Sequence, residues 1–172
     1  MDKKRVLILD TSVLCCWLQV PGKEETGPAD DRWNHARIDA LLQKEKTRHS
    51  TFVLPIATLI ETGNHIAQAP KLRFERAQAL ALAHYLREAA QAQSPWAAFT
   101  DQSELWATEN LRTLADTWPE LASQKISIGD ATIKDVAEFY ARAGFFVEIL
   151  TADAGLKAYE PIQVLAPPRR RR

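Results

Sequence analysis

Two carboxylates follow apolar, strand-like runs of the chain. Asp10 directly follows the run at residues 6–9, and Asp153 comes three residues after the run at 145–150. In a parallel sheet the carboxyl ends of the strands meet at one edge, where loops and helix starts converge on a ligand. Either acid alone also fits an ordinary turn or helix cap. Taken together, the two predict an acidic group at that edge.

Two further acids fall on predicted helices that start near the same edge. Asp130 opens a helix and lies near the centre of its apolar stripe, which directs it inward, although the position also fits an N-cap. Asp135 lies almost opposite that stripe, so we expect it in solvent. Glu61 lies off the apolar face of its helix, as a solvated residue would. It follows the strand end at Pro55 by only about one and a half turns, so it can project over the edge if the helix crosses there.

Four carboxylates at one edge would repel one another by several kcal/mol in a medium of low dielectric, so the cluster requires cations. Ligand sets made of oxygen alone favour Mg²⁺ or Mn²⁺ over Zn²⁺. The four histidines show no zinc spacing such as HExxH. Glu61 and His65 share a helix face, which leaves a softer metal as the less favoured alternative. The expected cofactor is therefore Mg²⁺ or Mn²⁺.

Short apolar runs alternate with helical patterns along the chain. The predicted strands lie at residues 6–9, 52–54, 145–150 and 162–165. The predicted helices lie at residues 32–45, 56–68, 72–91, 103–117 and 130–143. Such alternation favours an α/β fold, a three-layer α/β/α sandwich with a short parallel sheet.

The length of 172 residues, 46% of them hydrophobic, indicates one folded domain, which we place at residues 1–166. Residues 21–31 are rich in Pro, Gly and acidic residues and are predicted to form a loop. Residues 94–124 contain three tryptophans, too much apolar surface for a linker, and are interpreted as a helical insertion packed on the core. Residues 167–172, two prolines and four arginines, are predicted to be a basic tail.

Basic and acidic residues balance at 22 each, so no overall field attracts nucleic acid or a membrane. Any polyanion must be bound by local cations. The alternative for each cation is an ordinary solvated face or tail. The candidates for nucleic-acid binding are Lys71, Arg73, Arg76, Lys134, Lys157, Arg169, Arg170, Arg171 and Arg172.

The cysteines, Cys15 and Cys16, are adjacent in an apolar run, where a disulfide between them is disfavoured. They indicate buried thiols in a reducing compartment, and we expect a cytoplasmic protein. Three basic residues followed by an apolar segment resemble a secretory signal, but Asp10 interrupts the segment and no small-residue cleavage site follows Val20. No run of about 18 uncharged apolar residues occurs elsewhere, so we expect no contact with a membrane.

Four short motifs resemble, in order, the acidic motifs of PIN-domain nucleases. They are LILDTSVL at 7–14, LIET at 59–62, GDATI at 129–133 and ILTAD at 149–153. The resemblance spans roughly residues 5–165. It implies a PIN-like fold, and catalytic and metal-binding roles for Asp10, Glu61, Asp130 and Asp153. It also implies supporting hydroxyls at Thr11 or Ser12 and at Thr151.

Proteins of this family cleave RNA, or in some branches structured DNA, with Mg²⁺ or Mn²⁺. The resemblance therefore implies an endoribonuclease in which Asp10 is the central ligand, Asp130 and Asp153 are further ligands, and Glu61 is a ligand or orients water. The toxin branch of toxin–antitoxin pairs implies an antitoxin or other protein partner and a homo-oligomer. The loop at 21–31 and the insertion at 94–124 depart from that compact branch.

Two other functions remain as alternatives. The first is a PIN-like binding or scaffold module whose acidic edge no longer cleaves, although all four acids are retained in order. The second is a phosphatase with Asp10 as nucleophile. Aspartyl phosphatases carry a second acid two residues later, where this chain has Ser12.

Overall fold

A short parallel sheet forms the centre of the molecule. The computed structural model describes residues 4–69 and 75–162. Among these, β1 (Arg5–Leu9) lies between β4 (Thr51–Val53) and β5 (Phe146–Leu150), and both neighbours run parallel to it. Leu7 pairs with Phe52 on one side and with Glu148 on the other. The α/β class with a short parallel sheet, predicted from the sequence, is confirmed.

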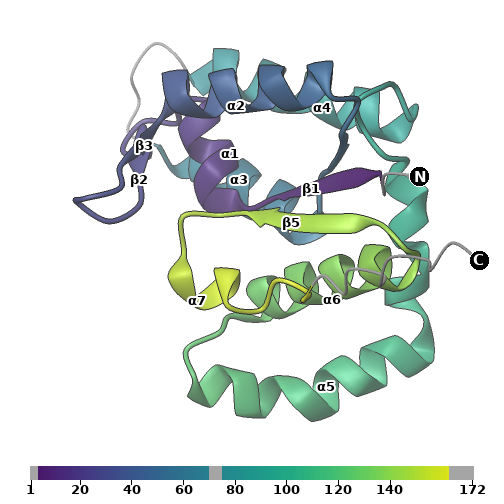
Figure 1. Cartoon of the computed structure of the whole chain (residues 1–172). Coiled ribbons are helices and arrows are strands. Elements are labelled where there is room, and N and C mark those ends of the chain that lie inside the picture. Colours follow the sequence, from purple (N-terminus) through teal and green to yellow (C-terminus); the bar gives the residue numbers. More distant parts are fainter. Residues whose placement is uncertain (1–3, 70–74, 163–172) are drawn as a thin grey trace, which may run out of the picture.

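The side chains of β1 alternate between two hydrophobic clusters, as the period of a strand requires. Leu7 and Leu9 pack in one cluster, and Val6 and Ile8 in the other, and all four are fully buried. The first cluster is covered by α1 (Thr11–Trp17), α2 (His35–Thr47), α3 (Ile56–Gln68) and α4 (Glu75–Ala90). The second is covered by α6 (Ile128–Arg142) and α7 (Ala154–Lys157). Helices thus lie on both faces of the sheet, which gives the three layers (Figure 1).

Four of the five predicted helices, at residues 32–45, 56–68, 72–91 and 130–143, are present, three of them with shifted ends. The bounds predicted for α3 are those observed. α2 begins after the predicted residue 32 because Asn34 is its N-cap and accepts a hydrogen bond from the backbone of Arg37 (3.0 Å). α6 begins before the predicted residue 130 because Ser127 is its N-cap. α4 lies within the predicted range 72–91, of which residues 72–74 are outside the described part.

The helix α1 is not among the elements predicted from the sequence. It follows β1 after one residue, and nearly all of its side chains are buried. Its seven residues make only about two turns and are buried on nearly all sides, so they lack the one-sided apolar stripe by which periodicity identifies a helix. The boundary is at Asp10, the N-cap of α1, so the residue that ends the strand also starts a helix.

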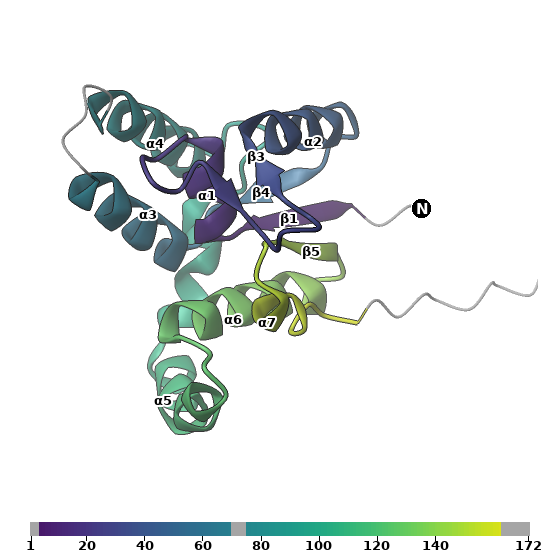
Figure 2. The ribbon, with the colours of Figure 1, turned by 90° about the vertical axis from the view of Figure 1, so that its left-hand side faces the viewer.

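The insertion at residues 94–124 is helical, but it is not the single helix predicted at 103–117. It contains a 3₁₀ helix, η1 (Phe99–Trp106), and then α5 (Thr108–Ser123), which continues past the predicted end through Pro119. Trp118 anchors α5 by donating its indole N–H to the carbonyl of Ile126 (3.2 Å). Figures 1 and 2 both show α5 on the far side of α6 from the sheet. The insertion thus adds an outer helix to one face of the sandwich.

The predicted loop at 21–31 contains part of a small antiparallel hairpin, β2 (Glu25–Thr26) paired with β3 (Trp33–Asn34). The prediction of a loop is wrong at the two residues of β2. Gly27 has φ +88°, and a Cβ there would lie 2.6 Å from the carbonyl oxygen of Asp31. The turn therefore requires glycine. The hairpin packs beside α1, where the Cys16 thiol donates to the carbonyls of Glu24 (3.0 Å) and Trp33 (3.6 Å).

The end of the chain is described only up to residue 162. Ile162 lies outside any strand and is 93% exposed. The rest of the strand predicted at 162–165 and the tail at 167–172 lie outside the described residues. In the part that the structure covers, no helix has the length and apolar character to cross a membrane.

Candidate active site

The four acids predicted from the sequence line one cleft at the carboxyl edge of the sheet. They come from four separate segments: the end of β1, the second turn of α3, the first turn of α6 and the loop after β5. The cleft has a volume of about 530 Å³. Its lining residues are Asp10, Thr11, Ser12, Cys15, Gly22, Lys23, Glu25, Thr26, Glu61, His65, Ser127, Asp130 and Asp153.

Asp10 is the most buried of the four acids, with 5% of its surface exposed. Its carboxylate accepts hydrogen bonds from the backbone of Thr11 (2.6 Å) and from the hydroxyls of Ser12 (2.6 Å) and Thr151 (2.8 Å). Burial raises the pKa of Asp10, those hydrogen bonds partly offset the rise, and the charge of Asp130 adds to it. The carboxylate is thus fixed in position, and no cation among the described residues forms an ion pair with it.

Glu61 is half-buried and is held by contacts on two sides. The Thr11 hydroxyl donates to its Oε2 (2.7 Å), and its Oε1 lies over Gly129, where a Cβ would collide with it. The solvated position that periodicity favoured for Glu61 is therefore wrong, and the position over the edge is confirmed. The residues that α3 buries are Thr58, Thr62 and Ile66.

Asp130 lies at the start of α6 but is not its N-cap. Ser127 has that role, and the two residues form a capping box in which the Ser127 hydroxyl donates to Asp130 Oδ2 (2.8 Å) and accepts from the Asp130 backbone (3.0 Å). Asp130 nevertheless lines the cleft, and its charge reaches Asp10. One residue therefore stabilises the helix start and adds negative charge to the site.

Asp153 is exposed and is the N-cap of α7, where its Oδ1 accepts from the backbone of Gly155 (2.6 Å) and Leu156 (3.2 Å). The backbone of Asp153 donates to the Thr151 hydroxyl (3.0 Å), and that hydroxyl donates in turn to Asp10. Thr151 thus connects the two acids that follow β1 and β5. The hydroxyls expected beside the acids are all in contact with them.

The predicted exposure of Asp135 is wrong. α5 packs against α6 along this side, and Asp135 lines a recess between the two helices. Burial raises the pKa of Asp135, and the charge of Lys134 partly offsets the rise. Asp135 does lie outside the acidic cleft, as its place opposite the apolar stripe of the helix predicts.

The oxygen donors of the cleft fit a hard divalent cation. Within residues 4–69 and 75–162, no three His, Cys, Asp or Glu side chains are grouped tightly enough to hold an ion by themselves. Mg²⁺ commonly binds through one or two carboxylates and keeps several waters, so it does not require such a group. The observation that favours a cation is the burial of Asp10 beside Asp130, where two negative charges share a confined space.

Three of the nine cations proposed from the sequence are described by the structure, and none of the three lines the cleft. Lys134 pairs with Glu138 (2.7 Å) and Lys157 with Glu160 (2.6 Å), and neither lines the cleft. Arg76 lines a different concavity. The remaining candidates lie outside the described residues: Lys71, Arg73, Arg169, Arg170, Arg171 and Arg172. Lys23 and Glu25, which do line the cleft, were not predicted because they fall in the segment interpreted as a loop.

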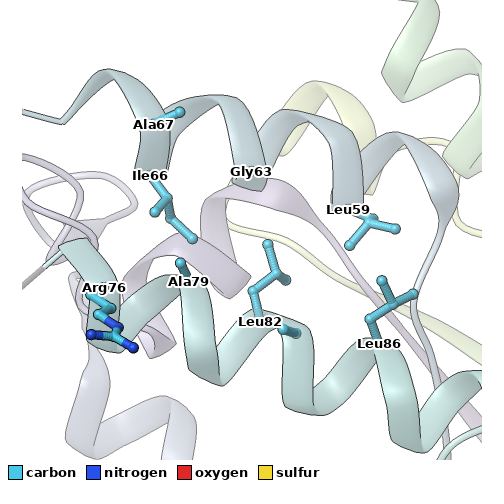
Figure 3. A pocket seen from close by; sticks show the side chains of 9 residues that line it. Leu59, Gly63, Ile66, Ala67, Arg76, Ala79, Leu82 and Leu86 are labelled. Carbon is cyan, nitrogen blue, oxygen red and sulfur yellow. The ribbon is translucent and has the colours of Figure 1, made fainter.

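The concavity that Arg76 lines is a groove of about 540 Å³ between α3 and α4. Figure 3 shows Leu59 and Ile66 of α3 pointing toward Leu82 and Leu86 of α4 across it. Among the described residues of its lining, Arg76 is the charged one and none is a carboxylate. It therefore offers apolar contact, whereas the chemistry of the molecule is concentrated in the acidic cleft.

Comparison with protein-family models, curated proteins and solved structures finds no match to this chain. Its function must therefore be inferred from the cleft. The cleft combines oxygen donors from four segments, hydroxyls that orient two of them, and a lysine and a histidine in the same lining. Such an arrangement can bind a divalent cation and a phosphate together.

Proposed function

We propose that this protein is a metal-dependent nuclease, an endoribonuclease that hydrolyses phosphodiester bonds with Mg²⁺ or Mn²⁺. The observation that carries the proposal is the convergence of Asp10, Glu61, Asp130 and Asp153 in one cleft, with Asp10 buried beside Asp130. The resemblance of the four motifs to those of PIN-domain nucleases supports it. DNA is the alternative substrate.

Each acid has a role consistent with its surroundings. Asp10, Asp130 and Asp153 would hold the cation, and Glu61 would hold it or accept a hydrogen bond from the attacking water. A bound divalent cation lowers the pKa of water and stabilises negative charge on a phosphate. The hydroxyls of Ser12 and Thr151 keep Asp10 in place, and that of Thr11 keeps Glu61 in place, so the donors are oriented before substrate binds.

The side chains of the cleft favour water as the nucleophile. Burial raises the pKa of Cys15 to about 11, so its thiol stays protonated at neutral pH. The hydroxyls of Thr11 and Ser12 both donate to carboxylates. Attack by water on a phosphodiester in this cleft would leave one product with a 3′-hydroxyl and the other with a 5′-phosphate.

We expect purified protein to cleave single-stranded RNA in Mg²⁺ or Mn²⁺ and to lose this activity completely in EDTA. The physical reason is that the cleft offers no activated side-chain nucleophile to replace a metal-bound water. Cleavage of a fluorescent oligonucleotide, with mass spectrometry of the product ends, measures both points. Undiminished cleavage in EDTA, or products with a 2′,3′-cyclic phosphate, would contradict the proposed mechanism.

A PIN-like binding module is the second candidate. The observation that favours it is that no three potential ligands in the described part of the chain are already grouped around a common point. Such a module would bind RNA in Mn²⁺ and leave it intact. We place either activity in the cytoplasm, because both cysteines are free and buried. A toxin or defence component held by a protein partner is the corresponding biological proposal.

A further inference from the structure

A tight turn after α1 carries Lys23 to the acidic cleft. The backbone of Lys23 donates to the carbonyl of Val20 (2.8 Å), which closes a four-residue turn. Pro21 and Gly22 occupy its two central positions, and Gly22 has φ +80°. Proline followed by glycine with positive φ is the signature of a type II turn. The Pro21–Gly22 turn therefore sets the direction in which the chain continues at Lys23.

Lys23 faces an excess of negative charge. It lines the cleft together with five carboxylates, the four acids described above and Glu25 of β2. It nevertheless forms no ion pair of 4.0 Å or less with any residue of the described part of the chain. The charge of Lys23 acts inside the cleft: it lowers the pKa of Cys15, which burial raises. The ammonium group thus stands near the site without being neutralised by one carboxylate.

The two lysines that are proposed from the sequence and described by the structure differ from Lys23 in both respects. Lys134 and Lys157 each pair with a carboxylate and lie outside the cleft. A chain with zero formal charge provides no general attraction for a polyanion, so a phosphate must be met by a local cation. Among the described residues, Lys23 is the lysine that lines the cleft.

We propose that Lys23 is a substrate-positioning residue that binds a backbone phosphate of RNA next to the phosphate that reacts. This inference rests on the proposed nuclease function. A lysine ammonium acts on a phosphate as a point charge through charge-assisted hydrogen bonds. Binding a neighbouring phosphate fixes the strand relative to Asp10 and Asp130. Lys23 contributes to binding and orientation, and the acids of the cleft provide the chemistry.

The competing role for Lys23 is that of a counter-ion for the carboxylates. In that case Lys23→Ala lowers the melting temperature of the metal-free protein and leaves RNA binding unchanged. A phosphate-binding role affects the KM for RNA, its salt dependence and the Kd. The two roles therefore predict changes in different measurements.

The test compares Lys23→Ala, Lys23→Arg and the matched control Lys44→Ala. Lys44 is an exposed lysine of α2 outside the cleft, so its loss changes net charge equally. Each variant is assayed for cleavage of a fluorescent single-stranded RNA in Mn²⁺, at KCl concentrations of about 50 to 200 mM. The Kd for the same RNA is measured by fluorescence anisotropy with Asp10→Asn added to each protein, to prevent cleavage.

We expect Lys23→Ala to raise KM and Kd about ten-fold, with a smaller change in kcat, and Lys23→Arg to restore most of the binding. The slope of log Kd against log [KCl] should fall by about 0.7, the value for one phosphate contact on a single strand. Lys44→Ala should match the parent protein. An unchanged KM and Kd in Lys23→Ala, or an equal rise in Lys44→Ala, would overturn the inference.

These outcomes separate this inference from the nuclease proposal. If the parent protein cleaves RNA in Mn²⁺ and Lys23→Ala has the same KM, the role of Lys23 is refuted and the nuclease proposal stands. If the parent binds RNA without cleaving it and Lys23→Ala weakens the binding, the nuclease proposal fails and the phosphate contact stands. If no variant binds or cleaves RNA, both are refuted.

Discussion

Replacing Asp10 by Asn should reduce metal-dependent RNA cleavage at least about 100-fold, the scale of losing one electrostatic contribution to a transition state. Asn keeps the size of the side chain, and the hydroxyls of Ser12 and Thr151 can reorient to meet its amide. The fold should therefore persist while the central negative charge is lost. Initial rates of cleavage in Mn²⁺, with circular dichroism to check the fold, measure the effect.

Asp135→Asn is the matched control for that variant. It makes the same chemical change on α6, at a half-buried residue in the recess against α5 and outside the cleft. We expect it to retain the activity of the wild-type protein. If Asp10→Asn is as active as Asp135→Asn, the reacting site lies elsewhere in the molecule.

The second large effect concerns stability in the absence of metal. Burial, with a contribution from the charge of Asp130, raises the pKa of Asp10 in the folded protein above its unfolded value. The folded state thus binds this proton more tightly than the unfolded state does. The resulting stabilisation is complete below the unfolded carboxyl pKa of about 3.9 and is lost as pH rises through the elevated folded-state pKa. At pH 7 to 8 the metal-free protein has therefore lost this stabilisation, because Asp10 is charged in the folded state.

Asp10→Asn should therefore be more stable than the wild type at pH 7 to 8 without metal, and the difference should vanish at low pH. With Mn²⁺ present, the wild type should instead be the more stable of the two proteins. An ion at about 100 times its Kd adds about 2.7 kcal/mol to the stability of the state that binds it. This corresponds to about 5–10 °C in the melting temperature of a chain of this size.

Thermal melts of both proteins at about pH 3.5 and at pH 8, with and without Mn²⁺, measure these effects. A rise with Mn²⁺ in the wild type, much smaller in Asp10→Asn, is the expected result. The contrary result is a wild type whose melting temperature does not change with Mn²⁺ and an Asp10→Asn protein that is no more stable than the wild type in EDTA. In that case the carboxylates of the cleft do not bind a cation together.

The sheet and the place of the acids on it were predictable because the central strand has an unambiguous pattern. All the residues of β1 from Val6 to Leu9 are fully buried, so the run is continuously apolar and ends abruptly at Asp10. The same holds at the end of β5, where Thr151 and Asp153 follow Leu150. In a parallel sheet these two ends lie at the same edge. The structure makes the two strands adjacent, and Asp10 donates its backbone N–H to the carbonyl of Leu150 (3.1 Å).

The orientation of Glu61 could not be predicted from helical periodicity. A helical wheel gives angles around the axis of α3 but not the direction from which the core approaches it. α3 buries Thr58, whose hydroxyl donates to the carbonyl of Leu9 (2.8 Å), and leaves Ile60 more than half exposed. A threonine that bonds to the end of a strand can occupy the buried face, and this rotates Glu61 toward the cleft.

The contribution of the segment after α1 was missed for a different reason. Its composition indicates turns. Turn residues predict the local shape of the backbone, but they do not show which part of the protein the turn contacts. Pro21 and Gly22 do form a turn, but only the packing of the hairpin against the rest of the chain brings Lys23 and Glu25 to the cleft. Contacts of this kind depend on tertiary structure.

The central claim is that the acids of the cleft hold a divalent cation, and a Mn²⁺-soaked crystal tests it most directly. Diffraction data collected at the manganese absorption edge locate the ion independently of any assumed ligand. The claim predicts an anomalous peak in the cleft, in contact with Asp10 and with Asp130 or Asp153. A cleft without such a peak, at a Mn²⁺ concentration at which the protein cleaves RNA, would contradict it.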